Sequence, residues 1–348
     1  MTWMVYGAYG YTGRLVAALA TERGEMPLIA GRDEKRLRAL AELVQLEHRV
    51  LPLDDPAALR RGLQGVDAVA HCAGPFSATW RPMVEACLAT GTHYLDITGE
   101  IDVLEAVLAR SDEAAAKGIS LLPGAGFDVV PSDCLAALLA QQLPGATHLA
   151  LAFRAGGGPS PGTAASAVES IRTPGRARVE GAIGPVPPAR RKRRVRFPGG
   201  EADVHAIAWG DVATAYHSTG IPNVVTYAVV PRAVSAVTAL APLSGVVLGN
   251  PLTRRMLKTL VSRLPGPSPS TRAGTDSVIW GEVADSTGRT VEGMLTGPNG
   301  YDLTADAVVR IAGQLEKGNV PTGALTPSRA LGADFVRQLD GVEVRIPA

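Results

Sequence analysis

Short apolar runs alternate with amphipathic helical patterns along the first part of the chain. The runs are continuous, as in strands that are buried on both faces of a parallel sheet. Six strands are predicted, at residues 3–8, 26–32, 49–54, 66–74, 93–99 and 119–126. Helical patterns separate them, at residues 13–24, 33–44, 55–65, 80–91 and 102–118. This alternation with right-handed crossovers predicts an α/β fold, a doubly wound Rossmann-type parallel sheet over residues 1–130.

The pattern changes after Pro131. A helix is expected at residues 132–143, and turn-like breaks then separate a series of strand-like runs. These runs lie at residues 148–155, 193–198, 204–209, 224–230, 277–285 and 289–297. An amphipathic helix is expected at residues 304–318. We therefore predict that residues 131–319 form a mixed α+β substrate domain.

Length and composition agree with a two-domain protein. The chain has 348 residues, of which 46% are hydrophobic, so it can bury two sizeable cores. Its net charge of +1 gives no overall attraction to nucleic acid or to an anionic membrane. Three unpaired cysteines fit a reducing cytoplasm, and the scattered histidines have no metal-ligand spacing. No signal peptide is recognisable before the first strand, so we expect a cytoplasmic protein.

One uncharged stretch, residues 233–253, is long enough to span a bilayer. Its prolines and glycines weaken that interpretation. A buried helical hairpin, the wall of an acyl-chain site or a subunit interface fits it better, and an interface there would make the protein a homodimer.

A glycine-rich turn follows the first strand and opens a helix. Gly7, Gly10 and Gly13 form a GxxGxxG spacing in which the first glycine permits a tight turn. The second lets a pyrophosphate approach the backbone, and the third lets the helix pack on the strand. A glycine-rich turn without a ligand is the alternative. We expect the turn to bind a dinucleotide through Gly7, Tyr9, Gly10, Tyr11, Thr12 and Gly13.

The end of the second strand favours NADP(H) over NAD(H). Gly31 and Arg32 stand where an NAD site carries an acidic residue for the ribose. Arg32 and Arg36 can bind a 2′-phosphate, whereas Asp33 fits better as the N-cap of the next helix. The alternative is that these arginines lie in the solvent-exposed first turn of a helix and bind no ligand, because such a turn has the same composition.

Further candidates follow the later strands, where ligands bind in such sheets. Ala73, Gly74 and Pro75 are expected beside the nicotinamide ribose. The ends of the fifth and sixth strands carry Tyr94, Asp96, Thr98, Glu100, Phe127, Asp128 and Asp133. Each carboxylate could cap the following helix, but their convergence on one crevice predicts at least one functional acid.

These motifs together resemble the saccharopine dehydrogenase-like oxidoreductase family, and within it the trans-acting enoyl reductases of polyketide and lipid synthesis. The matching stretches run from "GAYGYTGRL", "AGPF" and "YLDITGE" through "PGAGFDVVPSD" to "GPNGYDLTADA" and "GALTPSRALGADFV". The resemblance implies an NADP-binding domain, a catalytic second domain and a C-terminal segment, residues 320–348, that packs back on the first domain.

The expected activity is NADPH-dependent reduction of an α,β-unsaturated acyl group, carried as a thioester on coenzyme A or a carrier protein. Tyr94, Asp96, Asp128 and Tyr216 are the candidate catalytic residues, with Tyr216 as a proton donor or, alternatively, a core tyrosine. Cys72 fits a small buried residue better than a nucleophile. A saccharopine-type enzyme acting on a C–N bond and a non-catalytic NADP-binding sensor stay open. Arg154, Arg172, Arg176 and Arg178 could clamp a carboxylate in the former.

A basic run, residues 190–196, leaves an extended loop and enters the second strand-like run of the second domain. It has no interleaved aromatic residues, so nucleic acid is not expected as a partner. We expect either a solvated sheet edge or a patch that steers an acidic carrier toward the enzyme.

Overall fold

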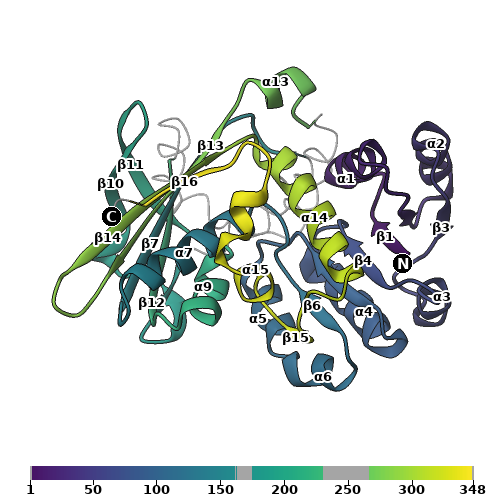
Figure 1. The fold of residues 1–348 in the computed structure, drawn as a ribbon, viewed down its shortest axis with the longest axis horizontal. Helices are drawn as coiled ribbons and strands as arrows, with labels where there is room; N and C mark the ends of the chain where they lie inside the picture. The colour runs from purple at the N-terminus through teal and green to yellow at the C-terminus, as the bar shows by residue number, and fades with distance from the viewer. Residues whose placement is uncertain (1, 161, 163–174, 230–265, 347–348) are drawn as a thin grey trace, which may run out of the picture. The chain divides into compact units, whose positions relative to one another are not determined.

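The computed structural model describes residues 2–160, 162, 175–229 and 266–346. The chain forms two compact units (Figure 1). The first combines residues 1–134 with 300–342, and the second combines residues 135–299 with 343–348. This division differs from the predicted boundaries, because residues 300–319 belong to the first unit and residues 343–348 to the second. The uncharged stretch 233–253 lies outside the described residues.

The first unit holds a parallel sheet of seven strands in the order β15-β6-β5-β4-β1-β2-β3. The strands are β1 (Trp3–Tyr6), β2 (Leu28–Gly31), β3 (His48–Val50), β4 (Ala68–His71), β5 (His93–Asp96), β6 (Ser120–Leu122) and β15 (Gly323–Ala324). The strand order reverses at β1 and β4, which is where doubly wound sheets bind their ligands. The predicted Rossmann-type sheet is therefore confirmed.

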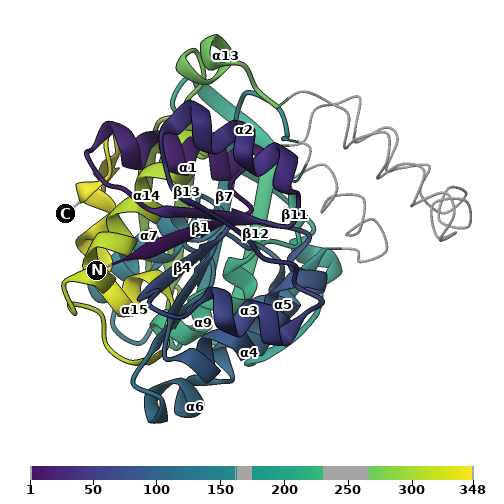
Figure 2. The same ribbon diagram turned by 90° about the vertical axis from the view of Figure 1, so that its right-hand side faces the viewer.

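Helices flank this sheet (Figure 2). They are α1 (Tyr11–Glu22), α2 (Glu34–Val44), α3 (Pro56–Gly62), α4 (Phe76–Thr90), α5 (Ile101–Leu108), α6 (Ser111–Ala116), α14 (Gly300–Glu316), α15 (Pro327–Leu331) and the 3₁₀ helix η2 (Ala333–Gln338). The single helix predicted at residues 102–118 is wrong, since α5 and α6 are separate. The break frees Ser111 Oγ to accept a hydrogen bond from the Ala324 N–H (3.1 Å), which ties α6 to β15.

The C-terminal segment returns only in part to the first unit. Its strand β15 extends the parallel sheet beside β6. Asp133 Oδ2 also accepts the Ser328 N–H at 2.8 Å, which holds the start of α15. The last strand, β16 (Glu343–Arg345), pairs instead with β14 of the second unit.

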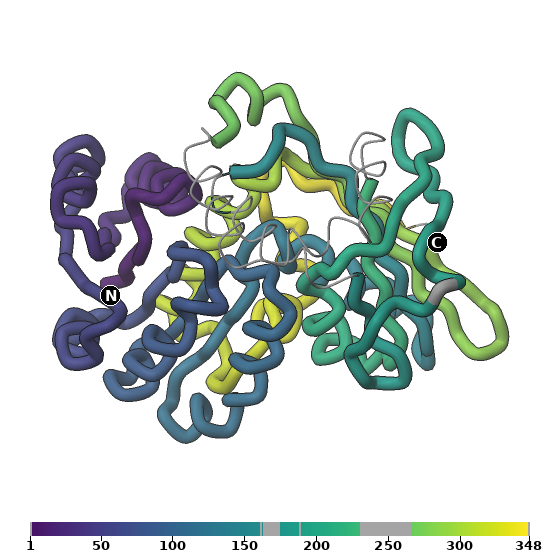
Figure 3. The backbone as a smooth tube through the Cα atoms, turned by 180° about the vertical axis from the view of Figure 1, so that it is seen from behind, coloured from purple at the N-terminus to yellow at the C-terminus, as the bar shows by residue number. Residues whose placement is uncertain are grey.

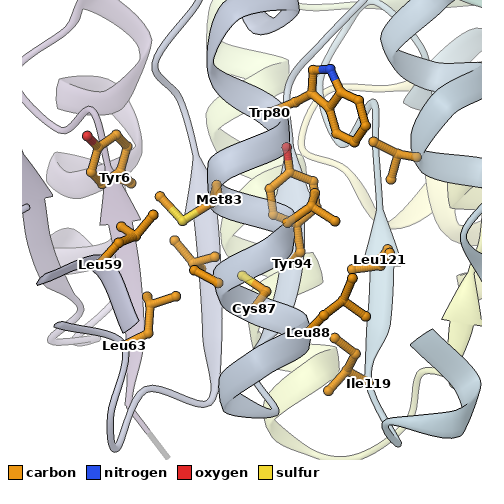
Figure 4. Packing of buried hydrophobic residues seen from close by; sticks show 14 of the residues in the cluster. Tyr6, Leu59, Leu63, Trp80, Met83, Cys87, Leu88, Tyr94, Ile119 and Leu121 are labelled. Atoms are coloured by element: carbon orange, nitrogen blue, oxygen red, sulfur yellow. The ribbon is translucent and has the colours of Figure 1, made fainter. Parts of the chain in front are cut away.

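The core of the first unit lies between α4 and the strands it covers (Figure 4). Trp80, Met83 and Cys87 of α4 are buried against Tyr94 of β5. Such packed side chains supply most of the free energy that fixes a domain. The strand ends that carry the candidate site therefore project from a rigid base.

Helix α14 packs beside α1 although about 280 residues separate them in sequence (Figures 1 and 2). Asp306 of α14 pairs with Arg23 at 2.6 Å and with Arg310 at 2.7 Å. Its second oxygen accepts the N–H of Asp340 at 2.7 Å. The Asp306 side chain is only 7% exposed, so this network explains why residues 300–319 belong to the first unit.

We expect Asp306→Asn to destabilise the protein by about 1–2 kcal/mol, because two guanidinium groups lose a shielded counter-charge. The matched control is Asp334→Asn, whose ion pair with Arg337 is exposed and should cost under about 0.5 kcal/mol. Urea unfolding of both variants measures the difference. Equal losses would show that the Asp306 network contributes no more than a surface pair.

The second unit holds a mixed sheet in the order β10-β11-β12-β7-β13-β14-β16, with β8 and β9 branching from β12. Its strands are β7 (His148–Ala155), β8 (Arg176–Val179), β9 (Ala182–Pro185), β10 (Lys192–Phe197), β11 (Gly200–Ile207), β12 (Asn223–Val229), β13 (Ser277–Ala284), β14 (Thr290–Gly297) and β16. Its helices are α7 (Val130–Gln142), which begins in the first unit, η1 (Pro188–Arg190), α9 (Asp211–Thr219) and α13 (Pro269–Ala273). Figure 3 shows the hairpins β10–β11 in teal and β13–β14 in green.

This unit confirms the predicted mixed α+β class. Hydrogen bonding is antiparallel throughout the main sheet except between β7 and β12. The β8–β9 hairpin and the helix α9 were not predicted from the sequence. The hairpin turns at Glu180 and Gly181, both with positive φ, and Glu-Gly is not among the pairs that mark such turns in a sequence, which are Asn-Gly, Asp-Gly and Gly-Gly.

The basic run begins at η1 and continues along β10. Lys192, Arg194 and Arg196 are exposed, whereas Val195 and Phe197 on the other face are buried. Arg193 also lies on the inner face, where it forms two hydrogen bonds with Glu282, at 2.8 and 2.6 Å. Among the described residues, no helix has both the length and the apolar character needed to cross a membrane.

Candidate functional site

The glycine turn joins β1 to α1 in a space that excludes larger side chains. Gly7 has a φ of +79°, and a Cβ there would lie 2.8 Å from the Cβ of Ala73. A Cβ on Gly13 would lie 2.4 Å from the Gly7 carbonyl oxygen. Gly10 donates its N–H to that same oxygen at 2.9 Å. The turn is therefore as tight as a dinucleotide-binding turn requires.

We expect Gly13→Ala to destabilise the protein by about 1–3 kcal/mol, since the new methyl group must displace backbone atoms. NADPH affinity should fall with it. The matched control is Gly313→Ala in α14, where a Cβ meets nothing within 4 Å and helix propensity should rise. Thermal melts and NADPH titrations of both variants test this. An unchanged melting temperature and NADPH affinity in Gly13→Ala would contradict the close approach of Gly13 to the Gly7 carbonyl oxygen.

Helix α1 presents an open N-terminus to the turn. Gly10 is its N-cap, so no side chain caps it, and its first turn carries no acidic residue. The first N–H groups and the positive end of the helix dipole are therefore available to a phosphate. Tyr11 and Thr12 open this helix and are partly exposed, and the Tyr11 ring packs on Tyr301 at 4.9 Å between centroids. This arrangement fits a bound pyrophosphate.

The end of β2 carries two arginines beside an aromatic ring. Tyr9 covers Gly31, where a Cβ would lie 2.5 Å from its ring carbon Cε1. The Arg36 guanidinium stacks on that ring, 4.5 Å from its centroid. Arg32 is exposed and has no ion pair or side-chain hydrogen bond among the described residues. Asp33 is the N-cap of α2, accepting the Arg36 N–H at 3.1 Å, as the sequence predicted.

The loop after β4 lies directly against the glycine turn. Ala73 approaches Gly7, and its carbonyl oxygen accepts a hydrogen bond from Thr79 Oγ1 at 2.7 Å. Gly74 is exposed, and Pro75 is the N-cap of α4. Glu100 accepts the first two N–H groups of that helix, those of Phe76 and Ser77, at 2.8 Å each. Glu100 therefore caps a helix and fixes this loop.

Tyr94 and Asp96 form a fully buried pair at the end of β5. The Tyr94 hydroxyl donates to Asp96 Oδ2 at 2.6 Å, and Asp96 Oδ1 accepts the N–H groups of Thr98 and Gly124 at 2.9 Å each. Burial raises the pKa of Asp96 to about 6, although the hydrogen bonds that it accepts act to lower it. Burial also raises the pKa of Tyr94 well above its ordinary value. Because both side chains are at most 1% exposed, their geometry favours positioning of the loops after β5 and β6 over contact with a substrate. Their catalytic role stays a prediction.

Asp128 differs from every carboxylate just described. It lies in the loop between β6 and α7, and no hydrogen bond or ion pair reaches its side chain from the described residues. Its carboxylate rests over Gly99, where a Cβ would lie 2.8 Å from Oδ2. Burial raises the pKa of Asp128 to about 6. A carboxyl group with that pKa can exchange a proton near neutral pH.

The loop that carries Asp128 is held on both sides. The Ala125 N–H donates to the Asp96 carbonyl oxygen at 2.6 Å, and the Phe127 N–H donates to Thr304 Oγ1 at 2.9 Å. The Phe127 ring also fills the space beside Gly300. The roles of Gly99 and Thr304 were not predicted from the sequence, although the two residues lie in the motifs "YLDITGE" and "GPNGYDLTADA", respectively, that carried the resemblance.

Tyr216 belongs to the second unit, on α9. Its side chain is 36% exposed, and the Arg178 guanidinium stacks on its ring, 4.5 Å from the centroid. The prediction that it is a core tyrosine is not supported by this exposure. Its role as a proton donor stays a prediction.

Cys72 follows β4 and is partly exposed. Burial of its sulfur, with Asp96 nearby, raises the pKa of the thiol to about 12. It is therefore protonated at neutral pH and unsuited to nucleophilic attack. The described part of the chain holds no cluster of three or more His, Cys, Asp or Glu side chains that could bind a metal ion.

Comparison with known proteins agrees with this geometry. Residues 3–122 match the family described as the saccharopine dehydrogenase NADP-binding domain. The chain therefore carries an NADP-binding domain of the saccharopine dehydrogenase type over these residues, and the predicted cofactor, NADP(H), is confirmed.

Two curated relatives illustrate the resemblance. A trans-acting enoyl reductase of Mycobacterium leprae is 34% identical over 139 residues, which cover 37% of this chain and 33% of that protein. A saccharopine dehydrogenase-like oxidoreductase of Mus musculus is 30% identical over 150 residues, covering 37% of this chain and 35% of that protein. These matches span about a third of the length of the relatives.

A solved structure extends the similarity in fold to the whole chain. Saccharopine dehydrogenase (L-Glu forming) from Saccharomyces cerevisiae superposes with a TM-score of 0.66 at 14% sequence identity, covering 100% of both chains. At this identity the match supports the two-part architecture and no more. The family match and the two curated relatives confirm the expected resemblance to saccharopine dehydrogenase-like oxidoreductases.

Proposed function

We propose that the protein is an NADPH-dependent reductase of an α,β-unsaturated acyl group of polyketide or lipid type, carried as a thioester. The observation that carries this proposal is the unpaired, readily protonated carboxyl group of Asp128. It follows β6, and the carboxyl ends of parallel strands share the edge of the sheet that carries the glycine turn. The similarity to a trans-acting enoyl reductase supports the choice of a carbon–carbon double bond.

When bound, NADPH supplies the hydride that adds to the β-carbon of the unsaturated acyl group. The electron pair of the double bond then moves toward the thioester oxygen, and the α-carbon takes a proton. Asp128 is suited to deliver that proton, because its pKa of about 6 leaves a protonated fraction at neutral pH. Asp96 has a similar pKa, but it is fully buried and its carboxylate is engaged by Tyr94 and two backbone N–H groups. Tyr94 and Asp96 hold the loop that carries it. The product is the saturated thioester.

The alternative proposal is oxidation or reduction of a C–N bond, as the family name suggests. An amino-acid adduct needs cations to bind its carboxylates. Arg178 is buried and donates to the carbonyl oxygens of Val212 and Gly181, at 3.0 and 2.8 Å. Arg154 donates to the Pro198 carbonyl oxygen at 2.7 Å and stacks on Phe197. Arg172 lies outside the described residues. The engagement of Arg154 and Arg178 favours the acyl substrate.

A carrier-linked substrate fits the exposed cations of β10. Arg196 of β10 and Arg191 just before it are exposed, and within the described residues Arg194 pairs only with the exposed Asp203. Such a patch can steer an acidic carrier protein at low ionic strength. Arg193 is unsuitable for testing this patch, because its reversal would break the pair with Glu282.

NADPH consumption with a matched set of substrates tests the proposed function. We expect turnover of an enoyl thioester and none of a cyclic imine or of the corresponding saturated thioester. Turnover of the imine alone would favour the C–N reaction. Tight NADPH binding without turnover of any substrate would favour a sensor.

A further inference from the structure

The sheet of the second unit curls, so that its edge strand β10 faces the inner strand β13. Three strands separate β10 from β13 in the sheet order. Arg193 of β10 nevertheless stacks on Trp280 of β13, 4.5 Å from the ring centroid, and binds Glu282 through both terminal nitrogens. The inner face between them is filled by an apolar cluster that includes Val195, Phe197 and Trp280. The unit therefore resembles a partly closed barrel, whose mouth is a common place for ligands.

A cavity of about 420 Å³ opens at this mouth. It is lined by polar residues from several elements: His148, Arg190, Lys192, Arg193, Tyr227 and Glu282. This volume falls within the ordinary range of small-molecule sites. It exceeds what a single ion needs and fits a small organic molecule.

The charges around the cavity are unbalanced. The Glu282 carboxylate is neutralised by Arg193, whose two hydrogen bonds hold it at the edge of the cavity. Arg190 and Lys192 have no ion pair and no side-chain hydrogen bond among the described residues. Lys192 is exposed on the outer face of β10, so Arg190 is the cation of the described lining that is left to bind a ligand in the cavity. Its charge is complementary to that of a phosphate group at neutral pH.

Uncharged donors complete the lining. Tyr227 is 4% exposed, and its hydroxyl has no hydrogen-bond partner among the described residues. His148 Nδ1 lies 3.0 Å from Thr147 Oγ1, which fixes the ring and leaves Nε2 for a ligand. Burial lowers the pKa of His148, and the nearby Arg190 lowers it further. Burial raises the pKa of Tyr227, and Arg190 opposes that rise. The three side chains therefore share one neighbourhood.

We propose that the mouth of the curled sheet is a binding site for the phosphate group of a small phosphorylated molecule, held by Arg190, the Tyr227 hydroxyl and His148 Nε2. A guanidinium fork, a hydroxyl and an imidazole nitrogen together suit the several oxygens of a phosphate. The phosphate can come from a free metabolite, in which case the site is independent of the proposed reduction, or from coenzyme A, in which case the site rests on the proposed thioester substrate.

Calorimetric titration with inorganic pyrophosphate tests the site. Saturating NADPH is kept in both solutions, so that the phosphate contacts of the first unit are occupied. We expect one site per chain that weakens at least tenfold in Arg190→Gln and in Tyr227→Phe. The matched control is Arg196→Gln, which removes an exposed charge from the same strand and should leave affinity within about twofold at moderate salt.

Melting temperatures establish that each variant is folded, and Tyr227→Phe removes only one oxygen atom. No binding of pyrophosphate by the NADPH-saturated protein would overturn the proposal, as would an equal loss in the Arg196→Gln control. Stronger binding of malonate than of pyrophosphate would also overturn it, because it would assign the site to carboxylates. Comparison of coenzyme A with dephospho-coenzyme A then identifies the source. A preference for coenzyme A assigns the site to its 3′-phosphate, equal binding of both assigns it to their diphosphate, and binding of neither assigns it to a free phosphorylated metabolite.

Discussion

Asp128→Asn should lower the turnover of an enoyl thioester by about 10²–10⁴-fold, the usual range for the loss of a general acid. Asparagine keeps the size of the side chain, and Asp128 has no hydrogen bond in the described part of the chain that the change would break. NADPH affinity should therefore stay within about threefold of the parent. Single-turnover kinetics with NADPH in excess measures the chemical step directly.

The same substitution, which should lower turnover, should raise the stability of the folded protein at neutral pH. Folding raises the pKa of Asp128 from 3.8 to about 6, so the folded state favours the protonated form. That contribution to stability is fully present below pH 3.8 and is lost as the pH rises through about 6. A neutral asparagine avoids the loss, so the stability of the variant relative to the parent should rise between pH 4 and pH 7, by at most about 3 kcal/mol.

The matched control for this pair of effects is Asp133→Asn. Asp133 is buried at the start of α7, and its carboxylate accepts the Ser328 N–H. Its replacement should destabilise the protein and should not raise stability at neutral pH. An Asp128→Asn variant with unchanged turnover would show that Asp128 is not the acid, even if the effect on stability were found.

Arg32→Ala should weaken NADPH binding about ten- to a hundredfold, which corresponds to a loss of roughly 1.5–3 kcal/mol from one charge-assisted contact. NADH affinity should change little, because NADH lacks the 2′-phosphate. Arg38→Ala is the matched control, since Arg38 lies on the following helix and pairs with Glu34 at 2.7 Å. Fluorescence titration with both cofactors measures the ratio. Equal losses for NADPH and NADH would contradict the assignment of Arg32.

The features that the sequence predicted well depend on neighbouring residues. The glycine turn, the N-cap at Asp33 and the parallel strands all follow from patterns a few residues long. A tight turn needs glycine at fixed positions whatever surrounds it, as the close approach of Gly13 to Gly7 illustrates. The missing acidic residue at the end of β2 was equally visible, because it too is a local feature.

The features that the sequence did not reveal depend on distant contacts. Strand β15 has two residues, too few for any periodic pattern, and it forms because β6 offers an open edge. Asp306 fixes α14 to the first unit through Arg23, a partner nearly 300 residues away. Arg193 looked like part of a solvated run, yet Glu282 on a distant strand draws it inward. Only the folded chain brings these partners together.

The same limit applies to the candidate acids. Asp96, Glu100, Asp128 and Asp133 all follow strands and look alike in the sequence. The structure gives Asp96, Glu100 and Asp133 backbone N–H groups to accept and leaves Asp128 without a partner in the described residues. Local pattern alone cannot separate capping from proton transfer, because both need a carboxylate at a strand end.

Transfer of deuterium from 4-deuterated NADPH to an enoyl thioester tests the central claim most directly. The account predicts that the saturated product carries one deuterium at its β-carbon and a solvent-derived proton at its α-carbon, as mass spectrometry and NMR of the product would show. Absence of label from the product, or label found only in the reduced form of an imine substrate, would contradict it.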